Sequence, residues 1–108
     1  VEGSFAVSDV GTLSNADAIP QAADELITLE GITAVVVVGE RDGTVHLSGR
    51  SRDDRVHMGR ALSSSVEGID DASAGGHARM GGGRIPADVE PSRETLIERI
   101  FDSLEGDV

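Results

Sequence analysis

Residues 32–50 read ITAVVVVGERDGTVHLSGR and hold the clearest structural pattern in this chain of 108 residues. The first part, 32–39, is almost continuously apolar, which is typical of a strand covered on both faces of a sheet. Residues 41–44 then supply an Asp-Gly pair, the usual signal of a tight hairpin turn. The pattern therefore predicts a buried central strand joined to an antiparallel neighbour.

The returning strand, 44–50, alternates apolar and polar residues. Because successive side chains of a strand point to opposite faces, Val45 and Leu47 are expected on one face. The other face then carries a row of polar side chains suited to phosphate: His46, Ser48 and Arg50.

The remaining pattern predicts an α/β (α+β) domain, a mixed sheet of four to five strands with helices packed on it. The expected order is β-α-β-β-α-β-α, with a glycine-rich loop after the second helix. The strands besides 32–39 and 44–50 are 4–10 and 84–89 (RIPADV), the latter at an edge or ending early because of Pro86. The helices are one running through Leu29 with an Asn15 or Asp17 cap, one capped by Asp53 or Asp54, and one opened by Ser92.

The length of 108 residues supports one domain, taken as 1–108. Because the chain starts at Val1 rather than Met, we expect it to be a piece of a longer polypeptide. Its longest apolar run is too short to span a bilayer, and it has no cysteine, so we expect a cytoplasmic domain that does not bind membranes.

The charge is strongly acidic: 20 Asp and Glu face 9 basic residues, all of them Arg, for a net charge of −11. Acidic excess together with the absence of Lys is typical of proteins from salt-accumulating halophiles, and we expect a halophilic archaeal source. An ordinary acidic domain from a genome that favours Arg codons is the alternative. Only Phe5 and Phe101 are aromatic, which argues against binding single strands by base stacking.

Most catalytic templates are missing. There is no Cys nucleophile, no G-x-S-x-G elbow and no phosphate-binding Walker loop. The three histidines lack metal-ligand spacing, and Asp53-Asp54 and Asp70-Asp71 are interpreted as caps or solvated turns, so no catalytic or metal site is expected in this chain.

Two segments retain functional potential: Ser48-Gly49-Arg50-Ser51, at the end of the alternating strand, and Gly75-Gly76-His77, which leads into Arg79. Glycines let a backbone approach a ligand, a helix starting there would offer N–H groups to an anion, and Arg or His adds hydrogen bonds to phosphate. Taken singly, each has a structural alternative, namely tight packing for the glycines and a surface ion pair for the arginine.

Together, S-x-R-S, a helix carrying G-R-A-L, and G-G-H-x-R-x-x-G resemble the C-terminal DHH-associated domain of DHH-family phosphoesterases. That family includes RecJ-like single-strand nucleases, oligoribonucleases and cyclic-dinucleotide phosphodiesterases. The resemblance is best over residues 30–86, and it departs from the family pattern at Ala74, Ala78 and Met80.

The resemblance implies that this chain holds substrate for a metal-dependent hydrolase and does not itself cut. Arg50 would hold a phosphate or sugar, Ser48 and Ser51 would support it, and the loop would contact substrate near the scissile phosphate through Gly75, Gly76, His77 and Arg79. The metal, manganese or magnesium, would be held by an N-terminal DHH catalytic domain of the same chain, with no cofactor bound here.

The partner implied first is a nucleic acid or a nucleotide phosphate, as for an exonuclease-like enzyme. A parent acting on cyclic dinucleotides, phosphorylated nucleosides or polyphosphate remains an alternative, as does a non-catalytic ligand-sensing or dimerisation domain. A homodimer also stays open.

The net charge of −11 predicts that folding requires salt, because repulsion among carboxylates opposes compaction at low ionic strength. Circular dichroism across a potassium chloride series should show the folded signal growing towards molar salt, where the screening length is about 3 Å. Unchanged stability from millimolar to molar salt would contradict the halophile interpretation.

Overall fold

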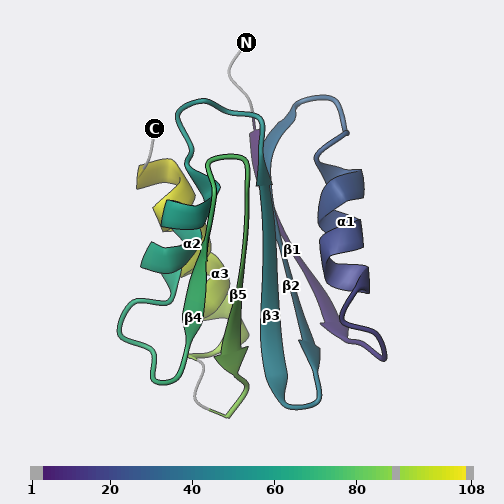
Figure 1. Cartoon of the computed structure of the whole chain (residues 1–108), viewed down its shortest axis with the longest axis vertical. Coiled ribbons are helices and arrows are strands. Elements are labelled where there is room, and N and C mark those ends of the chain that lie inside the picture. The colour runs from purple at the N-terminus through teal and green to yellow at the C-terminus, as the bar shows by residue number, and fades with distance from the viewer. Residues whose placement is uncertain (1–3, 89–90, 107–108) are drawn as a thin grey trace.

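A computed structural model describes residues 4–88 and 91–106, which form a five-stranded mixed sheet with three helices packed on it (Figure 1). The strand order across the sheet is β1-β2-β3-β5-β4. In chain order the elements are β1 (Ser4–Thr12), α1 (Ala18–Leu26), β2 (Ile32–Arg41), β3 (Thr44–Ser51), α2 (Met58–Ser65), β4 (Ser73–Gly76), β5 (Met80–Pro86) and α3 (Arg93–Gly106).

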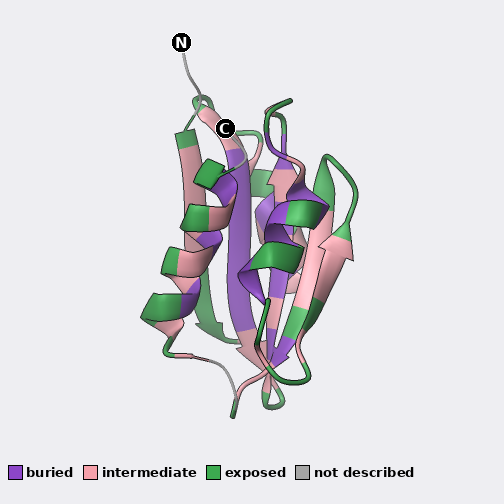
Figure 2. Cartoon of the chain, turned by 90° about the vertical axis from the view of Figure 1, so that its left-hand side faces the viewer, coloured by how far each residue is buried: buried purple, intermediate pink, exposed green. Residues whose placement is uncertain are grey.

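Strand β2 is the buried centre of the fold, as predicted (Figure 2). Its residues 34–38 have no solvent exposure at all. β2 runs parallel to β1 and antiparallel to β3. Val35 and Val37 pack with Ile19 and Ala23 of α1, whereas Val36 and Val38 face the opposite side of the sheet.

The predicted hairpin between β2 and β3 is confirmed. Arg41 pairs with Thr44 across a two-residue turn. Asp42 and Gly43 have φ values of 52° and 77°. Two successive positive φ angles are those of a type I′ turn, whose twist matches the two strands.

The helices cover the two sheet faces unequally. α2 and α3 pack on one face over a core of fourteen buried residues drawn from β2, β3, β5, the two helices and the residues that flank α2. On the other face, α1 makes its extensive contacts with β2 and β3. Within the described residues, β5, β4 and the side of β3 next to them therefore carry no helix on this face, and we call this part the open face.

Helix α1 is shorter than predicted, because it ends at Leu26 instead of Leu29. The Thr28 hydroxyl donates a hydrogen bond of 2.6 Å to the Glu25 carbonyl, and Gly31 then turns the chain into β2 with a φ of 87°. The N-cap residue Asp17 makes no capping hydrogen bond with its side chain, and the Asn15 side chain, two residues earlier, accepts from the Asp17 N–H and so closes the turn before the helix.

Helix α2 begins at Met58, so the prediction that Asp53 or Asp54 caps it is wrong. The cap is His57, whose Nδ1 accepts a hydrogen bond of 3.1 Å from the Arg60 N–H. Asp53 is already engaged, since its carboxylate accepts from both the N–H and the guanidinium of Arg55. An Asp bonded to the residue two positions on forms a turn rather than a helix cap.

The glycine-rich segment is a β-hairpin, which corrects the predicted loop and the predicted strand at 84–89. β4 pairs antiparallel with β5, and β5 starts at Met80 and ends at Pro86. β5 lies between β3 and β4, so Pro86 marks an early end rather than an edge strand. Val89 of the predicted strand lies outside the described residues.

Helix α3 follows Ser92 as predicted, and the Ser92 hydroxyl accepts a hydrogen bond from the Thr95 N–H. Leu96, Ile100 and Leu104 form its buried face. None of the described helices is long and apolar enough to cross a membrane.

Close packing of α2 on the β4–β5 hairpin explains part of the glycine content. A Cβ placed on Gly59 would lie 2.5 Å from the Gly76 carbonyl carbon, and one on Gly76 would lie 2.5 Å from the Gly81 Cα. A neighbouring glycine, Gly75, has no atom within 4 Å of the equivalent position. Packing therefore requires glycine at 59 and 76 but not at 75.

The change Gly59→Ala should lower the free energy of unfolding by about 1–3 kcal/mol, because the added methyl forces the helix away from the hairpin backbone. The matched control Gly75→Ala should change it by less than about 0.5 kcal/mol. Urea unfolding at constant molar salt measures both, and equal midpoints for the two variants would refute the close-packing explanation.

Candidate functional site

The alternation of β3 places its polar row as predicted. Val45, Leu47 and Gly49 are buried towards α2 and α3. The alternate residues of the strand are half-buried: Thr44, His46, Ser48 and Arg50. Val35, Val37 and Gly39 of β2 pair with Arg50, Ser48 and His46. Because paired residues of adjacent strands share a face, the polar row lies on the α1 side of the sheet.

Strand pairing extends this row across the open face. On β5, Arg84 lies opposite His46, Gly82 opposite Ser48, and Met80 opposite Arg50. On β4, Ser73 lies opposite Arg84 and Gly75 opposite Gly82. The open face therefore presents polar side chains from three adjacent strands. They surround a strip without side chains, which is formed by Gly75 and Gly82.

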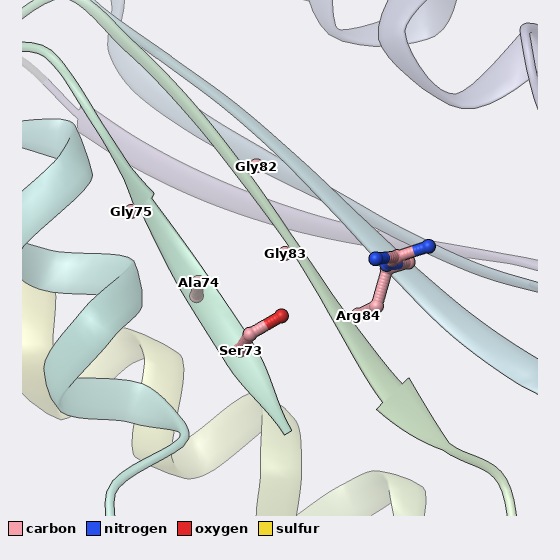
Figure 3. A pocket seen from close by; sticks show the side chains of 6 residues that line it. All are labelled: Ser73, Ala74, Gly75, Gly82, Gly83 and Arg84. Carbon is pink, nitrogen blue, oxygen red and sulfur yellow. The ribbon is translucent and has the colours of Figure 1, made fainter. Parts of the chain in front are cut away.

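A shallow hollow of about 350 Å³ lies over that strip. Figure 3 shows the side chains of Ser73 and Arg84 standing at one end of it, with Gly75, Gly82 and Gly83 adding no side chain to its floor. Groups of this kind can donate hydrogen bonds to an anion while the backbone approaches it closely.

Arg50 is held in place at the end of β3. Its Nε lies 2.7 Å from Oδ1 of Asp24 on α1, and its Nη1 donates to the Gly49 carbonyl at 2.8 Å. The Arg50 side chain is only 14 % exposed, whereas that of Asp24 is 64 % exposed. Nη2 is the guanidinium nitrogen for which the described residues supply no acceptor.

Ser51 is separated from Arg50 by the strand alternation. It is buried on the α2 side, and its hydroxyl donates to the backbone carbonyls of Asp53 and Val56. These bonds hold the loop that leads into α2. Ser48, in contrast, lies on the same face as Arg50.

His77 and Arg79 lie in the β4–β5 turn, against the start of α2. The Met58 and Gly59 N–H groups donate to the Ala78 and His77 carbonyls, each at 2.9 Å. The first N–H groups of α2 are thus occupied by the turn, and no helix starts at the glycines, so the anion site that such a helix start would have offered is not formed there.

Gly75 lies on the open face, whereas Gly76 faces α2. The guanidinium of Arg79 pairs at 3.0 Å with Asp54, beside a hollow of about 260 Å³ between the turn and the start of α2. The predicted residues thus fall into an open-face group (Ser48, Arg50, Gly75) and a turn group (His77, Arg79), with neither Arg50 nor Ser48 lining the hollow beside Arg79.

The sequence analysis missed the partner of Arg50 and the place of Arg84 and Ser73 on the open face. Nothing in the sequence pairs Asp24 with Arg50, because they come from different elements. The sequence did contain a pattern that places Arg84 on one face of a strand. Met80, Gly82 and Arg84 alternate with Gly81, Gly83 and Ile85. Starting the strand at residue 84 instead of 80 hid that alternation.

The Asp53 carboxylate is more acidic than an ordinary aspartate. Hydrogen bonds from the Arg55 side chain and N–H lower the pKa of Asp53 from 3.8 to about 2. Asp53 and Arg55 lie at 2.8 Å between Oδ2 and Nη2, and they fix the loop between β3 and α2. Among the described residues, no group of three or more His, Asp or Glu side chains is placed to hold a metal ion.

Comparisons with known proteins agree with this architecture. The DHHA1 domain family matches residues 2–106. An uncharacterized protein of Methanocaldococcus jannaschii, MJ1633, is 37 % identical over 86 residues, which cover 80 % of this chain and 17 % of that protein. The chain thus spans about a sixth of the length of this relative.

A solved structure with the same fold is the C-Ala domain of alanyl-tRNA synthetase from Aquifex aeolicus. It superposes with a TM-score of 0.72 over 93 % of this chain and 91 % of the domain. The sequence identity is 11 %, so the likeness is one of fold.

The change Asp53→Asn should lower stability at neutral pH and remove part of the acid sensitivity. The folded pKa lies below the unfolded one, so the contribution of Asp53 is present above about pH 3.8 and is lost as the pH falls towards about 2. The difference in unfolding free energy between the two proteins should therefore shrink between pH 4 and pH 2.

Urea unfolding at a series of pH values measures this difference. The control is Asp54→Asn, whose ion pair with Arg79 is exposed on both sides and should contribute little at neutral pH. A wild-type to Asp53→Asn difference that stays constant down to pH 2 would contradict the prediction.

Proposed function

Because this chain belongs to the DHHA1 domain family, we propose that it holds the phosphate groups of a nucleic acid or nucleotide for a DHH-family phosphoesterase. The observation that supports the proposal is the row of His46, Ser48 and Arg50 on β3, between α1 and the part of the sheet face that no described helix covers. Such a row offers aimed donors to a phosphate without any catalytic group beside them.

Arg50 is suited to a phosphate because its guanidinium is already oriented. Two of its nitrogens donate to Asp24 and to Gly49, which leaves Nη2 for a ligand. The pair with the exposed Asp24 contributes little energy, so a phosphate of higher charge can displace that carboxylate. Binding would then replace an internal anion with the substrate.

The net charge of −11 sets the conditions for binding. At low salt the chain repels polyanions, and at molar salt this repulsion is screened within about 3 Å. Counterion release also contributes little at high salt, so affinity depends on a few directed contacts. Binding through a few directed contacts at high salt fits the origin that we propose for the chain, a salt-accumulating cell. We also propose that the chain is located in the cytoplasm of that cell.

The finer features of the proposal follow from the family resemblance. Gly75, Gly76, His77 and Arg79 would contact substrate near the scissile bond, with Ser51 supporting from the loop. The described residues do not fit manganese or magnesium, so any metal of the parent enzyme would be held by its DHH domain. That domain would be the partner of the open face or the turn, and a RecJ-like or oligoribonuclease-like parent is our first choice.

Truncating Arg50 tests the proposal. Arg50→Ala should weaken binding of both a 5′-phosphorylated mononucleotide and a short single-stranded oligonucleotide by about tenfold or more, as expected for loss of a charge-assisted hydrogen bond. NMR titration in molar potassium chloride, where the chain is expected to be folded, measures the affinities.

The matched control is Arg99→Ala, because Arg99 lies on α3 and donates to the Glu67 carbonyl on the opposite side of the sheet. Arg93 is unsuitable, since its guanidinium contacts both Asp9 and Glu40. Equal affinities for the Arg50 and Arg99 variants, or hydrolysis of a phosphodiester by the purified chain with manganese, would overturn the proposed function. Tighter binding of a cyclic dinucleotide or polyphosphate would instead redirect it to that substrate.

A further inference from the structure

The open face carries a second arginine that the proposed function does not use. Arg84 lies on β5 between His46 of β3 and Ser73 of β4, and it is directly paired with both. Arg84 and Ser73 are exposed and His46 is half-buried. Three adjacent strands thus contribute a guanidinium, an imidazole and a hydroxyl at one level of the sheet.

The guanidinium of Arg84 makes no hydrogen bond or ion pair with the described residues. Most arginines of the chain contact carboxylates or backbone carbonyls; these are Arg41, Arg50, Arg52, Arg55, Arg79, Arg93 and Arg99. The side chains of Arg60 and Arg84, in contrast, have neither an ion pair nor a hydrogen bond within 4–88 and 91–106, and of the two only Arg84 lies on the open face, since Arg60 belongs to α2. A chain with 20 acidic residues nevertheless leaves all five N–H donors of the Arg84 side chain available.

Two hollows meet at Arg84 and Ser73. The first, of about 350 Å³, extends over Gly75 and Gly82 (Figure 3). By the strand register this is the direction of Met80, which pairs with Arg50. The second, of about 190 Å³, continues the other way to Thr44 and Asp71. The carboxylate of Asp71 bounds the surface on that side, so an anionic ligand at Arg84 is directed towards Arg50.

The floor between the two arginines is open to a ligand. Gly75 has an ordinary φ and empty space where a Cβ would be, so neither backbone strain nor packing explains a glycine at this position. Gly82 beside it lines the same hollow, and the nearest atom to the position of its Cβ would be the Leu47 carbonyl oxygen at 3.3 Å. The strip would let an extended chain lie flat on the sheet between the two guanidiniums.

The spacing of the two arginines selects the ligand. Arg84 is level with His46, which precedes Arg50 by four residues, or about 13 Å along a strand at about 3.3 Å per residue. Neighbouring phosphates of a nucleotide chain lie closer together than this. A mononucleotide therefore reaches one arginine, whereas an extended single-stranded oligonucleotide reaches both.

We propose that Arg84, with His46 and Ser73, is a second phosphate-binding site, and that an extended single-stranded oligonucleotide lies along the open face with another phosphate at Arg50. The site rests on the proposed function, because it assumes that Arg50 holds phosphate. It makes the length of the ligand a determinant of affinity.

The test compares two ligands on Arg84→Ala, with Arg99→Ala as the control. The probes are a 5′-phosphorylated mononucleotide and a single-stranded pentanucleotide, titrated by NMR at several potassium chloride concentrations that keep the chain folded. Arg84→Ala should weaken the pentanucleotide by about three- to tenfold and leave the mononucleotide unchanged. The slope of log affinity against log salt should fall by about 0.7 for the pentanucleotide, the value for one lost contact to a single strand.

The outcomes separate the two proposals. If Arg50→Ala weakens both ligands and Arg84→Ala weakens neither, the second site is wrong and the proposed function stands. If Arg84→Ala weakens both ligands equally, Arg84 acts on the first site or on the fold, and the second site is also wrong. If Arg50→Ala changes neither ligand, the proposed function fails and the second site fails with it.

Discussion

Complete burial of β2 on both faces is the constraint on which the rest of the structure depends. Residues 34–38 are inaccessible to solvent, so one helix layer must cover each face of this strand. α1 covers Val35 and Val37, and the pair α2 and α3 covers Val36 and Val38. Three short helices cannot cover a five-stranded sheet evenly, and the strands farthest from β1 lack a helix on the α1 side. The open face is thus a consequence of how the central strand is buried.

The glycines divide into two groups with different physical explanations. Gly59, Gly76 and Gly81 let α2 and the β4–β5 hairpin approach backbone to backbone, so they serve the fold. Gly75 and Gly82 line the open face, where little or nothing in the protein contacts the position of a side chain. Neighbouring residues of one glycine run therefore belong to opposite sides of the sheet. The segment Gly75-Gly76, which the sequence analysis took as part of one loop, thus contains one glycine required by packing and one that lies on a surface accessible to ligand.

Arginine is scarce relative to carboxylates in this chain, and each guanidinium is therefore informative. Most of them hold the protein together, as Arg93 does by contacting Asp9 of β1 and Glu40 of β2 from α3. Arg50 has a protein partner that is exposed and replaceable, and Arg84 has none among the described residues. The net charge of −11 repels anions overall. The guanidinium donors of Arg50 and Arg84 that are not held firmly by the protein are therefore the places where an anion can bind.

The sequence by itself determined the elements whose patterns are local. The apolar run of β2, the Asp-Gly turn, the alternation of β3 and the apolar face of α3 follow from periodicity and turn chemistry, and they placed Ser48 and Arg50 on one face. The start of α2, the β4–β5 hairpin and the separation of Arg50 from His77 were decided only by tertiary structure. Asp53 is occupied by Arg55, and the hairpin forms because its glycines admit α2 at backbone distance. Glycine has no side chain to give a periodic signal, so contacts between distant segments had to decide which face each one serves.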